Sequence, residues 1–209
     1  TIVIYTSDQG FYLGEHQWFD KRFMYEESFH TPLIISYPKH VKAGSECNQM
    51  VQNIDYAPTF LDLAGIAKPK YMPGTSLRPL FAGQTVKNWR KSLYYHYYDY
   101  PTYHMVRKHD GVRTDRYKLI HFYGKGGERA VQENKYQRQP GTSEYGCFQY
   151  LKSINYISDD PDVDYYELYD LKNDPNELNN IYGKSGTEKI EKDLKKKLAD
   201  YRKNLKVDE

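Results

Sequence analysis

The sequence predicts an α/β fold that continues into a small antiparallel sheet and closes with a packed helix. Three observations predict it. Strand and helix signals alternate over the first 90 residues, and short Tyr-rich runs separated by turns follow. Near the C-terminus, apolar residues recur at helical spacing. We therefore expect two parts, an α/β portion at 1–90 and an α+β subdomain at 91–209.

The first expected element is a strand at 2–5, an uninterrupted Ile-Val-Ile-Tyr run. Such a run is typical of a central strand covered on both faces, and a central strand needs neighbours that precede it. We therefore expect the chain to be the C-terminal part of a longer protein. Asp8 and Gln9 follow this strand as two oxygen donors, and Gly10 permits a sharp turn. This stretch is either an ordinary strand-ending turn or a cation site.

Two further elements complete the α/β portion. A short β-branched run at 32–38 is bounded by prolines and predicts a second strand. Residues 53–66 predict a helix, with Asp55 as the N-cap, Pro58 in the first turn and Gly65 as the stop.

The second part begins with strand-type runs rich in tyrosine. The stretch 124–164 is polar, contains glycine and lacks periodicity, so we expect a long loop there. The final periodic segment predicts an amphipathic helix at 187–206, with its lysines on the solvent side. The runs expected to form the antiparallel sheet are 92–98, 104–114, 117–123 and 165–171.

Composition limits the possible classes of function. The 209 residues suffice for one large domain or two small ones, and the formal charge of +2 argues against a nucleic-acid binder. No apolar stretch approaches the ~20 residues that span a bilayer. Cys47 and Cys147 fit no metal-site spacing and allow at most one disulfide. The 23 tyrosines predict a core built largely from rings with a polar tip.

Residues 7–38, SDQGFYLGEHQWFDKRFMYEESFHTPLIISYP, resemble the sulfatase family of the alkaline phosphatase superfamily. The matching features are the strand that ends in Ser-Asp-Gln-Gly, the Gly-Glu-His motif, a lysine shortly after it, and the Tyr-Glu-Glu-Ser and Pro-Leu-Ile stretches. NIDYAPTFLDLAGI, MPGTSLRPLFAG, GVRTDRYKLIHFY and ELYDLKNDPNELNN follow in the family's order. The resemblance covers most of the chain except 124–164 and the last helix. In overall look it is nearest to bacterial N-acetylglucosamine-6-sulfatase-like enzymes.

The resemblance implies the C-terminal part of an alkaline-phosphatase-like enzyme that hydrolyses sulfate esters of sugars. It implies one calcium ion, bound by Asp8 and Gln9 together with two aspartates upstream of this chain. A hard cation of this kind supplies charge to sulfate oxygens. The family's nucleophile is a formylglycine made from a Cys/Ser-x-Pro-x-Arg motif, which neither Cys47 nor Cys147 matches. We expect the nucleophile upstream, this chain alone to be inactive, and a periplasmic or secreted enzyme.

The resemblance also suggests roles for individual residues. Lys21 is expected to contact the sulfate as a compact point charge, although a surface lysine of a helix is the alternative. His16 is expected to donate to the sulfate or to protonate the leaving alcohol, with a packing histidine as the alternative. His104, Arg107 and His109 are candidate substrate contacts, unless these strand residues point into solvent.

Two competing interpretations remain. A phosphatase or phosphodiesterase of the same superfamily usually binds two zinc ions and places a histidine beside the strand-end aspartate. Gln9 at that position favours one hard cation instead. A non-catalytic, glycan-binding module is the second alternative, because the nucleophile motif is missing.

Overall fold

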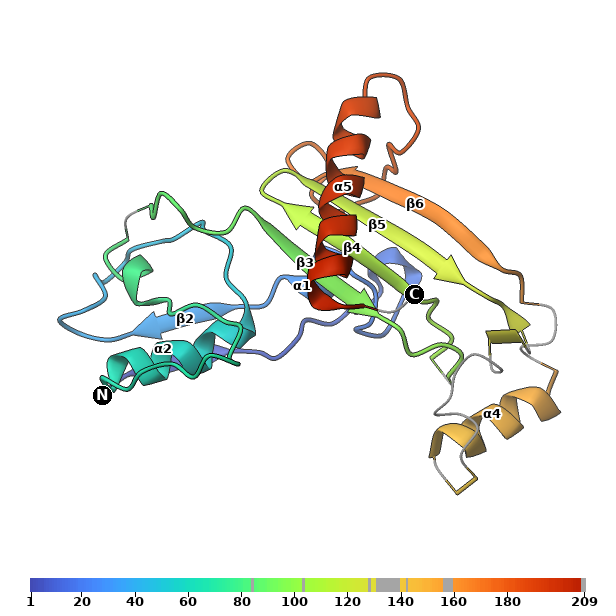
Figure 1. The fold of residues 1–209 in the computed structure, drawn as a ribbon, viewed down its shortest axis with the longest axis horizontal. Coiled ribbons are helices and arrows are strands. Elements are labelled where there is room, and N and C mark those ends of the chain that lie inside the picture. The colour runs from blue at the N-terminus through green and yellow to red at the C-terminus, as the bar shows by residue number, and fades with distance from the viewer. Residues whose placement is uncertain are drawn as a thin grey trace. The chain divides into compact units, whose positions relative to one another are not determined.

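The computed structural model describes residues 1–207 apart from 84, 103, 128, 131–139, 142 and 156–159. The chain forms two compact units (Figure 1). The first comprises 1–10 and 29–93, and the second comprises 11–28 and 94–209. This division differs from the one expected from sequence in two segments, because 11–28 groups with the C-terminal sheet and 91–93 with the first unit.

The first unit contains a two-stranded antiparallel sheet. Strand β1 (Val3–Thr6) pairs with β2 (Leu33–Ser36), with Val3 opposite Ser36 and Thr6 opposite Leu33. Both strands were predicted. Within this chain Val3 is 60% and Tyr5 is 65% exposed, and β2 alone pairs with β1 among the described residues. The expected covering of β1 depends on neighbours upstream of this chain and stays a prediction.

The predicted helix near residue 56 is present. A short 3-10 helix, η2 (Asn53–Asp55), leads into α2 (Tyr56–Leu63). Asp55 occupies the N-cap position as expected, but its buried carboxylate accepts from the backbone N–H groups of Gln52 (2.8 Å) and Thr75 (2.9 Å) and pairs with Arg90. The Asp55 side chain therefore binds the backbone at Gln52 and Thr75 and does not cap the helix.

The core of the first unit is built around a third short helix, η3 (Arg78–Leu80). The loop before it passes so close to Ile54 that a Cβ at Gly74 would lie 1.9 Å from the Ile54 carbonyl oxygen, and only glycine fits there. The buried core residues are Leu77, Leu80 and Phe81, with Leu33, Ile35, Tyr56 and Trp89 among those packed against them.

The second unit is a four-stranded sheet in the order β3-β4-β5-β6. Its strands are β3 (Ser92–Tyr97), β4 (His109–Thr114), β5 (Tyr117–Gly124) and β6 (Val163–Asp170). The β4–β5 and β5–β6 pairs are antiparallel, as predicted.

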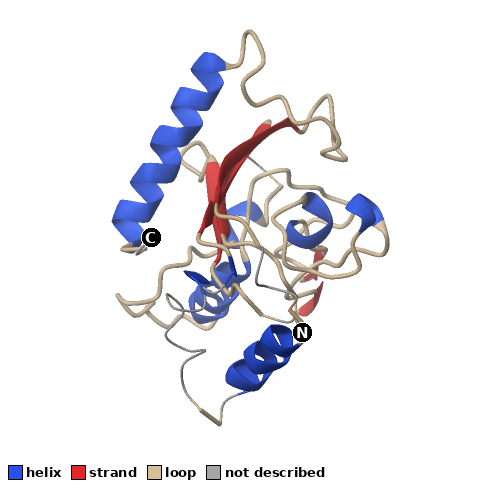
Figure 2. Cartoon of the chain, turned by 90° about the vertical axis from the view of Figure 1, so that its right-hand side faces the viewer, coloured by secondary structure: helices blue, strands red, loops and turns tan. Residues whose placement is uncertain are grey.

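One face of this sheet is covered by helix α5 (Glu188–Leu205), which was expected at 187–206 (Figures 1 and 2). Buried Leu194 and Leu198 belong to one apolar cluster with Val112, Leu119 and Leu168 of the strands. Because side chains alternate along a strand, Lys118 and Phe122 of β5 project from the opposite face. That face receives segment 11–28, which includes the short helices η1 (Glu15–Gln17) and α1 (Glu26–Phe29).

The expected loop at 124–164 contains a helix, α4 (Ser143–Ser153), so this expectation is wrong for 143–153. The sequence showed no helical signal there because the helix has no apolar stripe and contains Gly146. Part of the expected loop, at 131–139, 142 and 156–159, lies outside the described residues.

Candidate functional site

The proposed cation ligands follow β1 directly. The Ser7 hydroxyl donates to the Gln9 carbonyl oxygen at 2.6 Å and so turns the chain. Asp8 is exposed and Gln9 is half-buried. A carboxylate beside a carboxamide suits a hard cation, which takes six or more oxygen ligands. Across the described part of the chain, no three His, Cys, Asp or Glu residues are grouped to hold a metal. Asp8 and Gln9 could supply only part of the ligand set of a hard cation, and the calcium site stays a prediction.

In the second unit, the buried carboxylate of Asp20 contacts the side chains of Arg22 and His104 and the backbone of Lys21. Its Oδ1 accepts from the backbone N–H of Lys21 at 2.6 Å and pairs with the guanidinium of Arg22. Its Oδ2 lies 3.5 Å from Nδ1 of His104. The structure thus places Lys21 and His104, two residues singled out from sequence, in one cluster.

The backbone of Lys21 is held on both sides. Its N–H donates to Asp20, and its carbonyl oxygen accepts from the hydroxyl of buried Ser28 at 2.7 Å. Lys21 is half-buried and precedes α1, outside the helices of this segment. The alternative of a surface lysine on a helix is therefore wrong. The proposed contact with sulfate stays a prediction.

The imidazole of His104 lies in a partly desolvated environment. Burial is the main cause that lowers its pKa, and the nearby Arg22 guanidinium lowers it further against the opposing charge of Asp20. A neutral imidazole beside Lys21 is able to form a hydrogen bond with a sugar hydroxyl. The geometry is thus compatible with the substrate contact expected for His104.

His16 has the surroundings of a packed side chain. Its backbone is left-handed, at φ 50°, and its ring stacks on Tyr25 with centroids 4.3 Å apart. Its Nε2 lies 3.4 Å from the Glu27 carboxylate. These contacts match the alternative of a packing histidine. The role as proton donor stays a prediction that this geometry does not favour.

The remaining two sequence candidates differ in environment. Arg107 pairs with Asp160 at 2.7 Å and lies over the ring of Tyr100. His109 is completely buried, and burial lowers its pKa to about 4. We do not carry His109 forward as a substrate contact, because its ring is enclosed. Its aromatic neighbours, with centroids 5.0–5.6 Å away, are Phe23, Tyr95, Tyr97 and Phe122.

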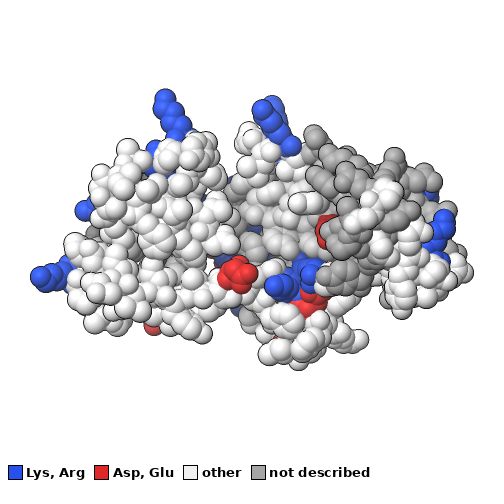
Figure 3. Space-filling model, turned by 90° about the horizontal axis from the view of Figure 1, so that it is seen from below, with Lys and Arg blue, Asp and Glu red and all other residues white. Residues whose placement is uncertain are grey.

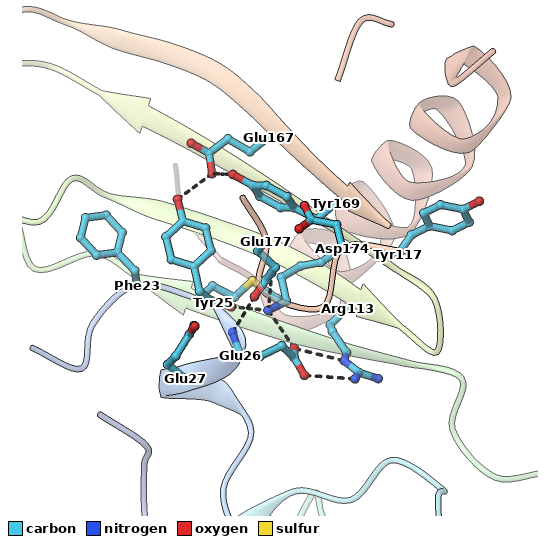
Figure 4. Close-up of polar contacts among 12 residues, drawn as sticks. Phe23, Tyr25, Glu26, Glu27, Arg113, Tyr117, Glu167, Tyr169, Asp174 and Glu177 are labelled. Carbon is cyan, nitrogen blue, oxygen red and sulfur yellow. Dashed lines mark hydrogen bonds and ion pairs between the residues drawn. The ribbon is translucent and has the colours of Figure 1, made fainter. Parts of the chain in front are cut away.

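A cleft of about 520 Å³ opens beside segment 11–28. The carboxylate of Glu167 accepts from the hydroxyls of Tyr25 (2.8 Å) and Tyr169 (2.9 Å) at this cleft (Figure 4). Burial raises the pKa of Glu167. Sequence analysis assigned no site role to these residues, although Tyr25 lies in the Tyr-Glu-Glu-Ser stretch and the other two lie in a Tyr-rich run. The cleft is lined by His16, Gln17, Trp18, Phe23, Tyr25, Phe122, Tyr165, Glu167 and Leu178.

Surface charge and hydropathy add two observations. On the face seen in Figure 3, Lys and Arg side chains are scattered rather than joined in a broad patch. Within the described ranges, every helix is too short or too polar to cross a membrane.

Comparison with known proteins gives consistent matches. The family model described as N-sulphoglucosamine sulphohydrolase, C-terminal, matches residues 14–139 and 142–204. An N-acetylglucosamine-6-O-sulfatase from Bacteroides thetaiotaomicron is 45% identical over 99% of this chain and 31% of its own length. An arylsulfatase K from Xenopus laevis is 29% identical over 97% of this chain and 32% of its own length.

A solved structure supports the same relationship. It is described as a complex with its substrate D-glucosamine-2-N,6-O-disulfate and superposes with a TM-score of 0.77 at 44% identity. The match covers 100% of this chain and 35% of that one. The chain therefore spans about a third of the length of the relatives it matches.

Proposed function

This chain belongs to the sulfatase family, as a member of its N-sulphoglucosamine sulphohydrolase C-terminal group, and we propose that the protein containing it hydrolyses sulfate esters of sugars. The first candidate substrate is N-acetylglucosamine carrying a 6-O-sulfate. The observation that carries this choice is the 45% identity over 99% of the chain to an N-acetylglucosamine-6-O-sulfatase.

The Asp20 cluster (Asp20, Lys21, Arg22 and His104) supplies chemistry suited to this reaction. A sulfate ester is a tetrahedral oxyanion, and Lys21 and Arg22 bring positive charge toward such a group. Asp20 fixes the Lys21 backbone, so the ammonium extends from a defined point. His104 adds a hydrogen-bonding group for a sugar hydroxyl. In this proposal the cluster binds and orients the sulfated sugar.

The remaining machinery is shared with residues outside this chain. Asp8 and Gln9 would hold a calcium ion, which when bound supplies further positive charge to the sulfate oxygens. We propose that the nucleophile is a formylglycine elsewhere in the protein, because neither Cys47 nor Cys147 stands in a Cys/Ser-x-Pro-x-Arg motif. We also propose a periplasmic or secreted location, because sulfated host glycans lie outside cells.

The proposed function is tested by assaying sulfate release from 6-sulfated N-acetylglucosamine. The full-length protein and the 209-residue chain are compared, with a phosphate monoester and a phosphodiester as competing substrates. We expect sulfate release by the full-length protein and none by the chain alone. Faster hydrolysis of either phosphate ester would favour the phosphatase alternative. Binding of the sugar without any hydrolysis would favour the glycan-binding module.

A further inference from the structure

A lysine ammonium is completely buried beneath segment 11–28. Lys118 projects from β5, and its Nζ meets three acceptors: the Met24 carbonyl oxygen at 2.7 Å, Glu26 Oε1 at 2.8 Å and Glu177 Oε1 at 2.8 Å (Figure 4). The Met24 carbonyl oxygen accepts a hydrogen bond from the ammonium, and both carboxylates lie at ion-pair distance from it.

The two carboxylates are themselves shared with other groups. Glu177 Oε2 accepts the backbone N–H of Glu26 at 2.6 Å, and the Glu26 carboxylate pairs with Arg113 at 3.2 Å. Two positive and two negative side chains therefore balance within this cluster, which consists of Glu26, Arg113, Lys118 and Glu177. Such balance is needed because an unpaired charge in a protein interior is strongly destabilising.

The cluster forms hydrogen bonds with the main chain that follows Lys21. One bond goes to the Met24 carbonyl oxygen and another to the Glu26 N–H, and both residues follow Lys21 closely in sequence. Strand β4 packs closely against Met24 in the same stretch, because a Cβ at Gly111 would lie 2.5 Å from the Met24 sulfur. Ser28, within the same stretch, holds the Lys21 carbonyl oxygen.

We propose that Lys118 and Glu177 are positioning residues for Lys21, because they fix the path of residues 20–28 from the sheet below. This inference rests on the proposed function, in which Lys21 faces the sulfate. Apolar packing buries this face of the sheet, but it does not by itself fix the position of the 20–28 backbone along the sheet. Directional hydrogen bonds to the Met24 carbonyl oxygen and from the Glu26 N–H fix that position. Buried ion pairs often add no stability over apolar residues of similar volume, so stability alone does not account for this cluster.

The decisive experiment uses the full-length protein and separates an effect on the position of Lys21 from an effect on the stability of the fold. Lys118→Met together with Glu177→Leu removes one positive and one negative charge and leaves the Glu26–Arg113 pair intact. We expect thermal unfolding close to wild type but a kcat reduced roughly 10- to 100-fold on 6-sulfated N-acetylglucosamine. A wild-type kcat in this double variant, together with wild-type stability, would show that the two residues do not position Lys21 and would overturn the inference.

Two single substitutions guard against a double variant that does not fold. Glu177→Gln keeps the shape of the side chain, and we expect a severalfold lower kcat. Arg116→Met is the matched control, since it removes a cation paired with Asp170 at the exposed end of the same hairpin. We expect it to leave kcat unchanged. Wild-type kcat in Glu177→Gln, or an equal loss in Arg116→Met, would contradict the proposal.

Amide hydrogen exchange keeps this inference separate from the proposed function. In Glu177→Gln we expect faster exchange at the amides of Lys21 and Glu26, and no change in the Arg116→Met control. Unchanged exchange at both amides would overturn the positioning role, whatever the substrate. Absence of sulfate release by the wild-type protein would instead overturn the proposed function.

Discussion

Oδ2 of Asp20 lies 3.5 Å from Nδ1 of His104, although the two residues are far apart in the sequence. The same carboxylate binds the N–H of Lys21 and pairs with Arg22. One acidic side chain thus joins a loop of segment 11–28 to the stretch that precedes β4. The arrangement of the proposed substrate-binding residues in this unit depends on that carboxylate.

Asp20→Asn is expected to lower kcat/KM for the sulfated sugar. The amide keeps one acceptor but loses the charge that holds Arg22, and charge-assisted bonds contribute roughly 1.5–3 kcal/mol. A loss of that size corresponds to about 10- to 100-fold. Asp62→Asn is the control, because Asp62 forms an exposed ion pair with Arg78 in the other unit. Steady-state kinetics of both full-length variants measure the effect, and equal values for them would speak against the role of Asp20.

Lys21→Ala is expected to reduce kcat/KM by roughly 10- to 100-fold while the protein stays folded. In the proposed function the ammonium would face developing charge on the sulfate, where such a contact is worth roughly 1.5–3 kcal/mol. Lys21→Arg should restore activity only in part, because a planar guanidinium does not replace a point charge. Lys42→Ala, at an exposed lysine, is the control and should change nothing. Wild-type kcat/KM in Lys21→Ala would end the assignment.

Metal analysis of the full-length protein is expected to find one calcium ion and no stoichiometric zinc. The carboxylate of Asp8 and the amide of Gln9 are hard oxygen donors, which suit calcium rather than zinc. Removal of calcium by a chelator should abolish sulfate release, and added calcium should restore it. Asp8→Asn should weaken binding, as measured by titration of the metal-free protein. Stoichiometric zinc would contradict this prediction.

The stability of the chain is expected to fall in acid partly through Glu26. Burial alone would raise the pKa of Glu26, but the Lys118 ammonium and the Arg113 guanidinium hold it at about 2. A carboxyl with a depressed folded-state pKa stabilises the fold above its unfolded value, near 4.5, and loses this contribution as the pH falls toward 2. The full contribution is about 3 kcal/mol.

The test compares the slope of unfolding free energy against pH in wild type and Glu26→Gln. We expect a shallower slope for the variant between about pH 4.5 and 2, whatever its absolute stability. Burial raises the pKa of Glu177 to about 7, so that group titrates above this window. Glu46→Gln, at an exposed carboxylate, serves as the control. Identical slopes in wild type and Glu26→Gln would refute the prediction.

Local sequence patterns predicted most of the elements. The Tyr-rich runs became strands because β-branched and aromatic residues suit a half-buried pleated surface, and Leu194 and Leu198 marked the closing helix. Helix α4 was missed because it lacks apolar periodicity. Strand β1 is more exposed in this chain than its apolar run predicts, because its expected neighbours lie upstream.

The candidate site was predicted only in part. The family resemblance suggested roles for Lys21 and His104. It suggested none for Asp20 and Arg22, although they flank Lys21 directly. The adjacent Asp-Lys-Arg charges were the available signal. Lys118 resembled an ordinary strand lysine, because its partners at 24–26 and 177 are remote in sequence and no local pattern encodes them.

The enclosure of His109 by aromatic rings gives the second unit an internal optical reporter. Phe23, Tyr95, Tyr97 and Phe122 are held at fixed angles around a single imidazole, and they come from segment 11–28 and from strands β3 and β5. Rings fixed in an asymmetric environment produce near-ultraviolet circular dichroism, which disappears when packing loosens although the backbone persists. Detachment of segment 11–28 from the sheet should therefore weaken the near-ultraviolet circular dichroism before the far-ultraviolet spectrum changes.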